Sequence, residues 1–213
     1  MEKTNYTKPV LLCGVSGKIG SGKDTVADFI IQHMPDLLFK KKSFAYNVKH
    51  IASIISGLPM EDMLSQDGKN KVLPLYGGIT VGNLQQVIGT NLFRTHFDDM
   101  VWIKSLFAPY VQESDSWIVS DVRFKNEADY IRSLGGIIIR LEGDPGGVRA
   151  RSTRDMTHAS ETELDDYEHF DIIMQTQKGE EKERRLVTLL YAMSNAKMNG
   201  EYDQYFSKKP IHI

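Results

Sequence analysis

The sequence lacks the features that mark secreted, membrane-spanning or nucleic-acid-binding proteins. Its 213 residues include one cysteine, Cys13, so no intrachain disulfide can form. No stretch approaches the roughly 18 consecutive apolar residues of a membrane span, and residues 1–9, which we interpret as a short leader, lack the apolar core of a secretory signal. The 26 lysines and arginines are balanced by 28 acidic residues. We therefore expect a cytoplasmic protein with a small-molecule partner, neither nucleic acid nor membrane.

Motifs for covalent catalysis are also missing. The sequence has no Gly-x-Ser-x-Gly elbow. Cys13 lies in the apolar run 10–13, where we expect it to pack in the core. No evident nucleophile remains for a covalent intermediate.

Short apolar runs alternate with helical patterns along the chain. We expect strands near 10–15, 37–44, 117–121, 137–141 and 170–174, and helices near 24–34, 45–55, 83–97, 100–111, 127–134 and 182–198. Residues 60–78 show an irregular pattern. The alternation predicts one α/β domain over 1–213, with a mostly parallel five-stranded sheet covered by helices on both faces in three layers.

The segment 17–25 joins the first predicted strand to the first predicted helix. Gly17, Gly22 and Lys23 meet the spacing Gly-x-x-x-x-Gly-Lys of loops that bind nucleoside triphosphates. Such a loop points successive backbone N–H groups at phosphate, and the helix adds its positive end. We expect Lys23 to neutralise charge on the β- and γ-phosphates during transfer. The predicted ATP-binding residues are Gly20, Ser21, Gly22, Lys23, Asp24 and Thr25.

Asp24 departs from the strict motif, which has Ser or Thr at this position to contact magnesium. Either Thr25 supplies a hydroxyl to a phosphate, or Asp24 holds magnesium through water, and the sequence is compatible with both. The alternative interpretation is a glycine-rich turn with Asp24 as the N-cap of a helix. The buried strand before the turn and the helix after it favour a phosphate loop.

The predicted strand at 117–121 ends in an acid and is followed by Arg123. Ligands of parallel α/β folds bind at this edge of the sheet. Arg123 is suited to hold a monophosphate through two parallel hydrogen bonds. Asp121 is suited to steer magnesium, to orient the substrate or to fix Arg123. A purely structural Asp121–Arg123 pair is the alternative.

Three arginines, Arg149, Arg151 and Arg154, follow a glycine-rich stretch. A lid-like segment at about 143–161 would close over phosphates, exclude water and bring positive charge to the transferred group. The alternative is a solvated basic turn. His158 and the acids after it we interpret as a helix start and a solvated face, without a dedicated metal site.

Several segments together resemble a known family. They are residues 16–25 (SGKIGSGKDT), 44–49 (FAYNVK), 84–90 (LQQVIGT) with Arg94 and Trp102, 121–127 (DVRFKNE) and 157–161 (THASE). They are similar to the viral and bacteriophage deoxynucleoside monophosphate kinases, relatives of the adenylate kinases in the P-loop superfamily. The similarity covers most of the chain. The family also carries Gly-Lys-Asp-Thr, so Asp24 agrees with it.

The resemblance implies an adenylate-kinase-like P-loop fold with a helical monophosphate-binding region at about 45–113. It implies transfer of the ATP γ-phosphoryl group to a nucleoside monophosphate, with ATP and Mg²⁺ as cofactors, and Mg²⁺ near Asp24, Thr25 or Asp121. The catalytic residues that the resemblance implies are Lys23, Arg123 and Arg151. A homodimer and, if the protein is viral, a location in the host cytoplasm are compatible with it. The implied acceptor residues are Lys49, Gln86, Gly89, Thr90, Arg94, Trp102, Asp121, Arg123 and Glu127.

Residues 80–83 depart from the family, whose members often carry a basic residue there. A contact to the acceptor phosphate is therefore lost or relocated. Trp102 either stacks on a base or is simply buried in a helix.

Two other functions are compatible with the phosphate loop alone. The first is another small-molecule kinase, of the dephospho-coenzyme A or phosphomevalonate type, against which the Gly-Thr and Asp-x-Arg segments argue. The second is a regulatory module that binds ATP or GTP without transfer. The absence of an Asn-Lys-x-Asp motif argues against the GTP-binding form.

Overall fold

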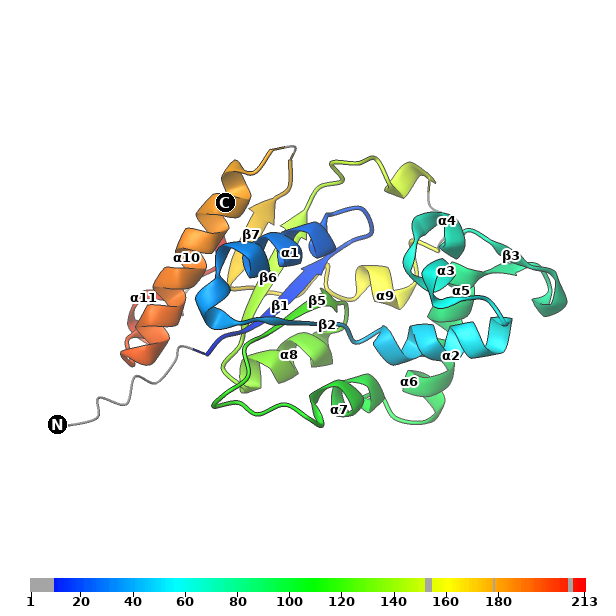
Figure 1. Cartoon of the computed structure of the whole chain (residues 1–213), viewed down its shortest axis with the longest axis horizontal. Helices are drawn as coiled ribbons and strands as arrows, with labels where there is room; N and C mark the ends of the chain where they lie inside the picture. Colours follow the sequence, from blue (N-terminus) through cyan, green and yellow to red (C-terminus); the bar gives the residue numbers. More distant parts are fainter. Residues whose placement is uncertain (1–9, 152–154, 178, 207–208) are drawn as a thin grey trace.

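A parallel six-stranded sheet forms the centre of the computed structural model, which describes all residues except 1–9, 152–154, 178 and 207–208 (Figure 1). The strand order is β2-β5-β1-β6-β7-β8, and each pairing is parallel. The strands are β1 (Leu12–Gly17), β2 (Lys40–Lys42), β5 (Trp117–Val122), β6 (Ile137–Glu142), β7 (Ile172–Gln175) and β8 (Ile211–His212). The parallel α/β architecture is confirmed. The expected number of five strands is wrong, because the two-residue β8 extends the edge beside β7.

Both faces of the sheet are buried, and neighbouring residues of a strand point to opposite sides. Leu12 packs in one hydrophobic cluster with α2 (Tyr46–Ser56), α5 (Val81–Gln86), α7 (Val101–Phe107) and α8 (Lys125–Ser133). Cys13 packs in the other cluster with α1 (Lys23–His33) and α10 (Glu181–Met198). The prediction that Cys13 is a core residue is confirmed, since its side chain is fully buried. Helix α11 (Tyr202–Phe206) packs beside α10.

A helical region lies beside the sheet, between β2 and β5 in the chain (Figure 1). It holds α2, α5 and α7 together with α3 (Met60–Leu64), α4 (Gln66–Lys69), the π-helical segment η3 (Val87–Leu92) and α6 (Phe93–His96). The helices expected near 45–55, 83–97 and 100–111 are present. The segment 60–78 is more regular than expected, because α3 and α4 are too short to show a helical period. It also contains the short 3-10 helix η2 (Pro74–Tyr76) and the strand β3 (Val72–Leu73), which pairs antiparallel with β4 (Ile79–Thr80).

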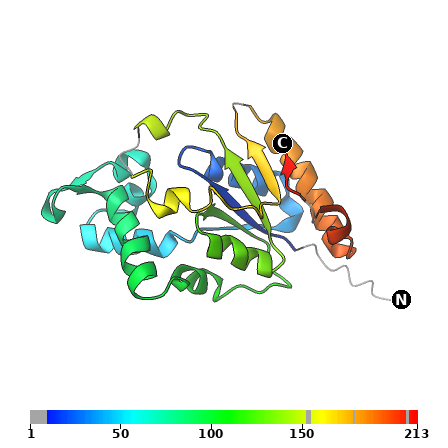
Figure 2. The same cartoon turned by 180° about the vertical axis from the view of Figure 1, so that it is seen from behind.

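Three loops meet at the carboxyl ends of β1, β5 and β6, which are adjacent in the sheet. The short helix α9 (Ala159–Thr162) lies between the loop after β1 and the helical region in both views (Figures 1 and 2). The remaining short helices are η1 (Pro35–Leu37) and η4 (Arg149–Arg151). No helix in the described part of the chain has the length and apolar character needed to cross a bilayer.

Candidate active site

The candidate phosphate loop runs from β1 to the start of α1. Gly22 is the N-cap residue of α1, and its φ of 84° lies in the left-handed region that favours glycine. The helix therefore begins at Lys23, and the interpretation of Asp24 as the N-cap is wrong. Because the first N–H groups of a helix have no partner within it, this end is suited to bind an anion.

Lys23 turns back onto its own loop. Its Nζ donates to the carbonyl oxygens of Gly17 at 2.5 Å and Lys18 at 2.9 Å. Burial, and after it the positive charge of Arg123, lowers the pKa of Lys23 to about 7, while Glu161 opposes the shift. A phosphate bound at the loop would supply the negative charge that favours the protonated amine.

Ser21 lies inside the same loop. Its side chain is fully buried, and its Oγ has no hydrogen-bond partner within the described residues. A Cβ atom on neighbouring Gly22 would meet nothing within 4 Å, so the loop is open at that point. Since buried polar atoms are normally hydrogen-bonded, the unpaired Oγ fits a loop that is completed by a phosphate group.

Asp24 follows Lys23 on the first turn of α1. Its Oδ1 accepts a hydrogen bond from Ser120 Oγ at 3.0 Å and forms an ion pair with Lys41 Nζ at 3.1 Å. Ser120 belongs to β5, so the carboxylate connects α1 with the edge of the sheet. The Asp24 side chain is 78% exposed and Thr25 is exposed beside it. Both therefore remain accessible to a ligand.

The tip of the phosphate loop is held by residues that follow β6. Arg149 Nε donates to the carbonyl oxygen of Ile19 at 3.0 Å, and its Nη2 donates to that of Gly143 at 2.5 Å. Lys18 Nζ forms an ion pair with Asp165 Oδ2 at 2.6 Å. Arg149 is therefore bound to the loop, and the alternative of a solvated basic turn is wrong for this residue.

The segment 143–151 packs close to the phosphate loop. A Cβ atom on Gly20 would lie 2.3 Å from Asp144 Oδ1, and the Asp144 carboxylate accepts the N–H of Arg149 at 2.9 Å. Arg154 lies outside the described residues, and so does the side chain of Arg151.

Asp121 binds the start of α2. Its Oδ1 accepts the N–H of Phe44 at 2.8 Å, and its Oδ2 accepts Ser43 Oγ–H at 2.7 Å and the N–H of Ala45 at 2.9 Å. A carboxylate is favoured at the positive end of a helix. Asp121 thus fixes α2 to the end of β5, and the alternative of a structural pair with Arg123 is wrong.

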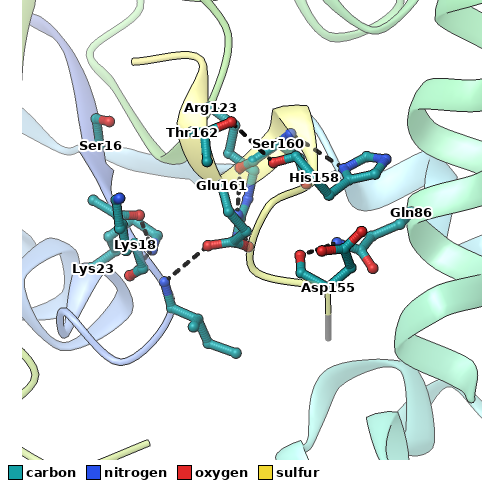
Figure 3. A network of polar contacts seen from close by, with 12 residues as sticks. Ser16, Lys18, Lys23, Gln86, Arg123, Asp155, His158, Ser160, Glu161 and Thr162 are labelled. Atoms are coloured by element: carbon teal, nitrogen blue, oxygen red, sulfur yellow. Dashed lines mark hydrogen bonds and ion pairs between the residues drawn. The ribbon is translucent and has the colours of Figure 1, made fainter. Parts of the chain in front are cut away.

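Arg123 instead pairs with Glu161, which also contacts the phosphate loop (Figure 3). Arg123 Nη1 donates to Glu161 Oε1, and to the carbonyl oxygen of Ser160 at 2.9 Å. Glu161 Oε2 accepts the N–H of Ile19 at 3.2 Å. The Glu161 side chain is 0% exposed and that of Arg123 is 18% exposed. One buried carboxylate therefore joins the ends of β1 and β5.

A cavity opens beside Arg123 at the end of β5. It brings together most of the predicted acceptor residues. These are Gln86, Gly89, Thr90, Trp102, Asp121, Arg123 and Glu127. Phe44, Val48 and Phe124 contribute apolar walls. Arg123 is the single cation among the described residues that line the cavity, consistent with the lack of a basic residue at 80–83.

Glu127 is buried at this cavity. Its Oε2 accepts the N–H groups of Arg123 at 2.8 Å and Phe124 at 3.2 Å, and its Oε1 lies 3.3 Å from Arg94 Nη2. Burial raises the pKa of Glu127 to about 7, although Arg94 opposes the shift. Arg94 itself does not line the cavity. It donates to the carbonyl oxygen of Asp99 at 2.6 Å and holds Glu127 from behind.

The helical wall of the cavity is fixed by side-chain hydrogen bonds. Trp102 Nε1 donates to the carbonyl oxygen of Gly89, in the π-helical η3, at 2.7 Å. Trp102 is 6% exposed, so it is a buried residue whose ring also reaches the cavity. Gln86 Nε2 donates to the carbonyl oxygen of Asp155 at 3.2 Å.

Lys49 lies apart from the other predicted acceptor residues. It lines a neighbouring cleft, together with Lys41, Lys42 and Asp24. Asp121 and Trp102 border both hollows, so the cleft adjoins the acceptor cavity.

Glu161 and Ser160 are absent from the predicted site residues. The sequence pattern predicts that the acids after His158 start a helix and face solvent. Glu161 does lie in the first turn of α9, but its side chain is buried and not solvated, whereas Asp166 is 76% exposed as expected. The available signal was the segment 157–161, which carries part of the family resemblance. Within the described residues, no group of three or more His, Cys, Asp or Glu side chains could hold a metal ion.

Comparison with known proteins gives a consistent result. Residues 60–182 match the family model described as deoxynucleotide monophosphate kinase. A protein of Acanthamoeba polyphaga mimivirus, provisionally named a deoxynucleotide monophosphate kinase, is 30% identical over 184 residues, covering 79% of this chain and 90% of that protein. The deoxynucleoside-5'-monophosphate kinase of Escherichia phage T5 is 26% identical over 179 residues, covering 57% and 72%. The deoxynucleotide monophosphate kinase of Enterobacteria phage T4 is 30% identical over 103 residues, covering 45% and 40%.

Proposed function

The chain belongs to the deoxynucleotide monophosphate kinase family, and from this premise we propose that it transfers the γ-phosphoryl group of ATP to a deoxynucleoside monophosphate, which becomes the diphosphate. Neither the family match nor the relatives favour a dephospho-coenzyme A kinase, a phosphomevalonate kinase or a regulatory module. The partners in this proposal are small nucleotides.

One observation carries the proposal: the phosphate loop and the acceptor cavity meet at a common edge of the sheet. The contacts from Ile19 through Glu161 to Arg123 connect the two. A donor phosphate at the loop and an acceptor phosphate at Arg123 would therefore lie side by side, as direct transfer requires.

The chemistry needs no strong base, because an acceptor phosphate oxygen is already anionic at neutral pH. Positioning and neutralisation of charge then supply most of the rate. In this proposal Lys23 neutralises the transferred group and Arg123 binds the acceptor phosphate. Gln86, Thr90 and Trp102 line the space for the nucleoside.

Magnesium, when bound, would neutralise charge on the ATP phosphates. Of the residues predicted near the ion, Asp24 fits because its carboxylate is accessible and follows Lys23 directly. Thr25 offers a hydroxyl beside it. Asp121 fits less well, since both of its oxygens bind the start of α2.

The segment 143–161 keeps its proposed role as a lid. Arg149 already contacts the phosphate loop through the carbonyl oxygen of Ile19. Arg151 and Arg154 stay candidates for contact with the transferred group.

A coupled assay of ADP release tests the proposed function. The full chain is mixed with ATP and Mg²⁺ and with each of a panel of deoxy- and ribonucleoside monophosphates. We expect at least one deoxynucleoside monophosphate to stimulate ADP release well above the rate without acceptor. The Lys23→Ala protein, purified in the same way, controls for contaminating kinases. Stimulation by no acceptor would overturn the proposal.

A further inference from the structure

Glu161 carries a buried charge at the junction of the two sides of the site. Its side chain is fully buried, and its two oxygens contact groups from different loops, Arg123 Nη1 and the N–H of Ile19. A buried carboxylate is tolerated only when it is paired and hydrogen-bonded, and removal of one partner leaves the other uncompensated. Arg123 therefore supplies a positive charge that balances the buried Glu161 carboxylate.

The helix that carries Glu161 is itself anchored to the acceptor side. His158 Nδ1 accepts the N–H of Ser160 at 3.2 Å, which makes His158 the N-cap of α9. His158 Nε2 lies 3.1 Å from Asn91 Oδ1 in η3, and therefore carries the proton of that hydrogen bond. The contact of Asp155 with Gln86 adds a second anchor. Glu161 thus projects from an element that is fixed to the wall of the acceptor cavity.

Arg123 is held through a single nitrogen of its guanidinium group. Both of its side-chain contacts, to Glu161 and to the Ser160 carbonyl oxygen, use Nη1. Arg123 lines the cavity, and it also lines a small hollow beside Gly17 and Glu161 at the end of β1. An arginine binds phosphate best when its planar group is held in one orientation, because less conformational entropy is then lost on binding.

We propose that Glu161 is a positioning residue for phosphoryl transfer: it orients Arg123 toward the acceptor phosphate and fixes the Ile19 turn of the phosphate loop, and so sets the distance between the two phosphates. This inference rests on the proposed function of Arg123 as the acceptor-phosphate ligand. Glu161 contacts neither substrate in this role. It acts through Arg123 and through the Ile19 turn of the phosphate loop.

The first test is Glu161→Gln, which keeps the shape of the side chain and one acceptor oxygen but removes its charge. We expect kcat/KM for the deoxynucleoside monophosphate to fall about 30-fold, as for loss of a charged hydrogen bond. The KM for ATP should change by less than about threefold, because the amide oxygen still accepts the Ile19 N–H. Glu163→Gln is the matched control, since Glu163 follows α9 and binds the N–H of Lys125 at 3.3 Å. It should stay within about twofold of the parent.

The second test combines Glu161→Gln with Arg123→Ala and separates positioning from a general structural role. If Glu161 acts through Arg123, adding Glu161→Gln to Arg123→Ala should cost less than about a further twofold in acceptor kcat/KM. Independent, multiplicative losses would overturn the inference, and so would an unchanged Glu161→Gln enzyme. If Glu161→Gln does not fold, Glu161→Asp replaces it, with the same expected non-additivity.

The result for Arg123→Ala alone keeps this inference distinct from the proposed function. If Arg123→Ala spares use of the acceptor, the assignment of Arg123 fails and the inference falls with it. If Arg123→Ala is selective for the acceptor while Glu161→Gln is silent or additive, only the inference is overturned.

Discussion

The phosphate loop and the acceptor cavity lie next to each other but are assembled in different ways. The loop is one continuous stretch between β1 and α1. The cavity takes residues from α2, α5, η3, α7, β5 and α8, with Ser160 from α9. One region is therefore defined by local sequence, and the other by tertiary packing.

The polar groups of the two regions also differ in how far they are satisfied. In the loop, Ser21 Oγ has no partner among the described residues and Lys23 binds its own loop carbonyls. In the cavity, Asp121 and Glu127 each accept hydrogen bonds from two backbone N–H groups and contact a further side chain. The loop thus keeps one buried hydroxyl unpaired among the described residues, whereas the carboxylates of the cavity are already hydrogen-bonded.

Lys23→Ala should have the largest effect and should leave the fold intact. We expect kcat to fall about 10³-fold or more, because a charge that neutralises the transferred group is lost. The midpoint of thermal unfolding should change little, since the contacts of Lys23 Nζ lie within one loop. Steady-state kinetics and thermal denaturation measure the two effects. Lys40→Ala, at an exposed side chain that pairs with Asp115, is the control. A fully active Lys23→Ala enzyme would contradict the role of the loop.

Arg123→Ala should have the next largest effect, and this effect should be confined to use of the monophosphate acceptor. We expect kcat/KM for the monophosphate to fall about 100-fold, with less than about a threefold change in the KM for ATP. Initial rates at varied concentrations of each substrate measure both values. Arg184→Ala, which removes an exposed helical ion pair with Glu180, is the control. Equal losses for both substrates would mean that the two regions do not act separately.

Glu127→Gln should give the smallest effect, a change in how stability depends on pH. The pKa of Glu127 is raised from 4.5 to about 7 in the folded protein, so the folded state binds this proton more tightly than the unfolded state does. Its contribution to stability is fully present below about pH 4.5 and is lost as the pH rises through about 7.

Across this range we expect the free energy of unfolding of the parent to fall relative to that of Glu127→Gln, by on the order of 1–3 kcal/mol. Urea denaturation at several pH values provides the measurement. Parallel curves for the two proteins would show that the buried carboxyl of the acceptor side does not titrate in this way.

The same contrast explains what could be predicted from the sequence. The phosphate loop and the central strands are local patterns, and the structure places them close to the predicted residues. The partner of Arg123 could not be derived locally, because Glu161 lies 38 positions further along the chain. Its acidic neighbours resemble an ordinary solvated face, and only the fold distinguishes the buried member. The sequence pattern does not predict strand β8 or helices α3 and α4, because elements this short do not show a measurable period.

The contacts of Ile19 have a consequence for the order in which the protein becomes functional during synthesis. Its N–H is held by Glu161, which is 142 positions later in the chain, and its carbonyl oxygen by Arg149. The strand before the loop, β1, also finds both sheet neighbours, β5 and β6, in the later half of the chain. On the ribosome, the phosphate loop therefore emerges well before Arg149 and Glu161, the residues that brace it. Under the proposed function, competence to bind ATP would thus be tied to completion of the fold, because a chain cut before Arg149 would carry the motif without these contacts.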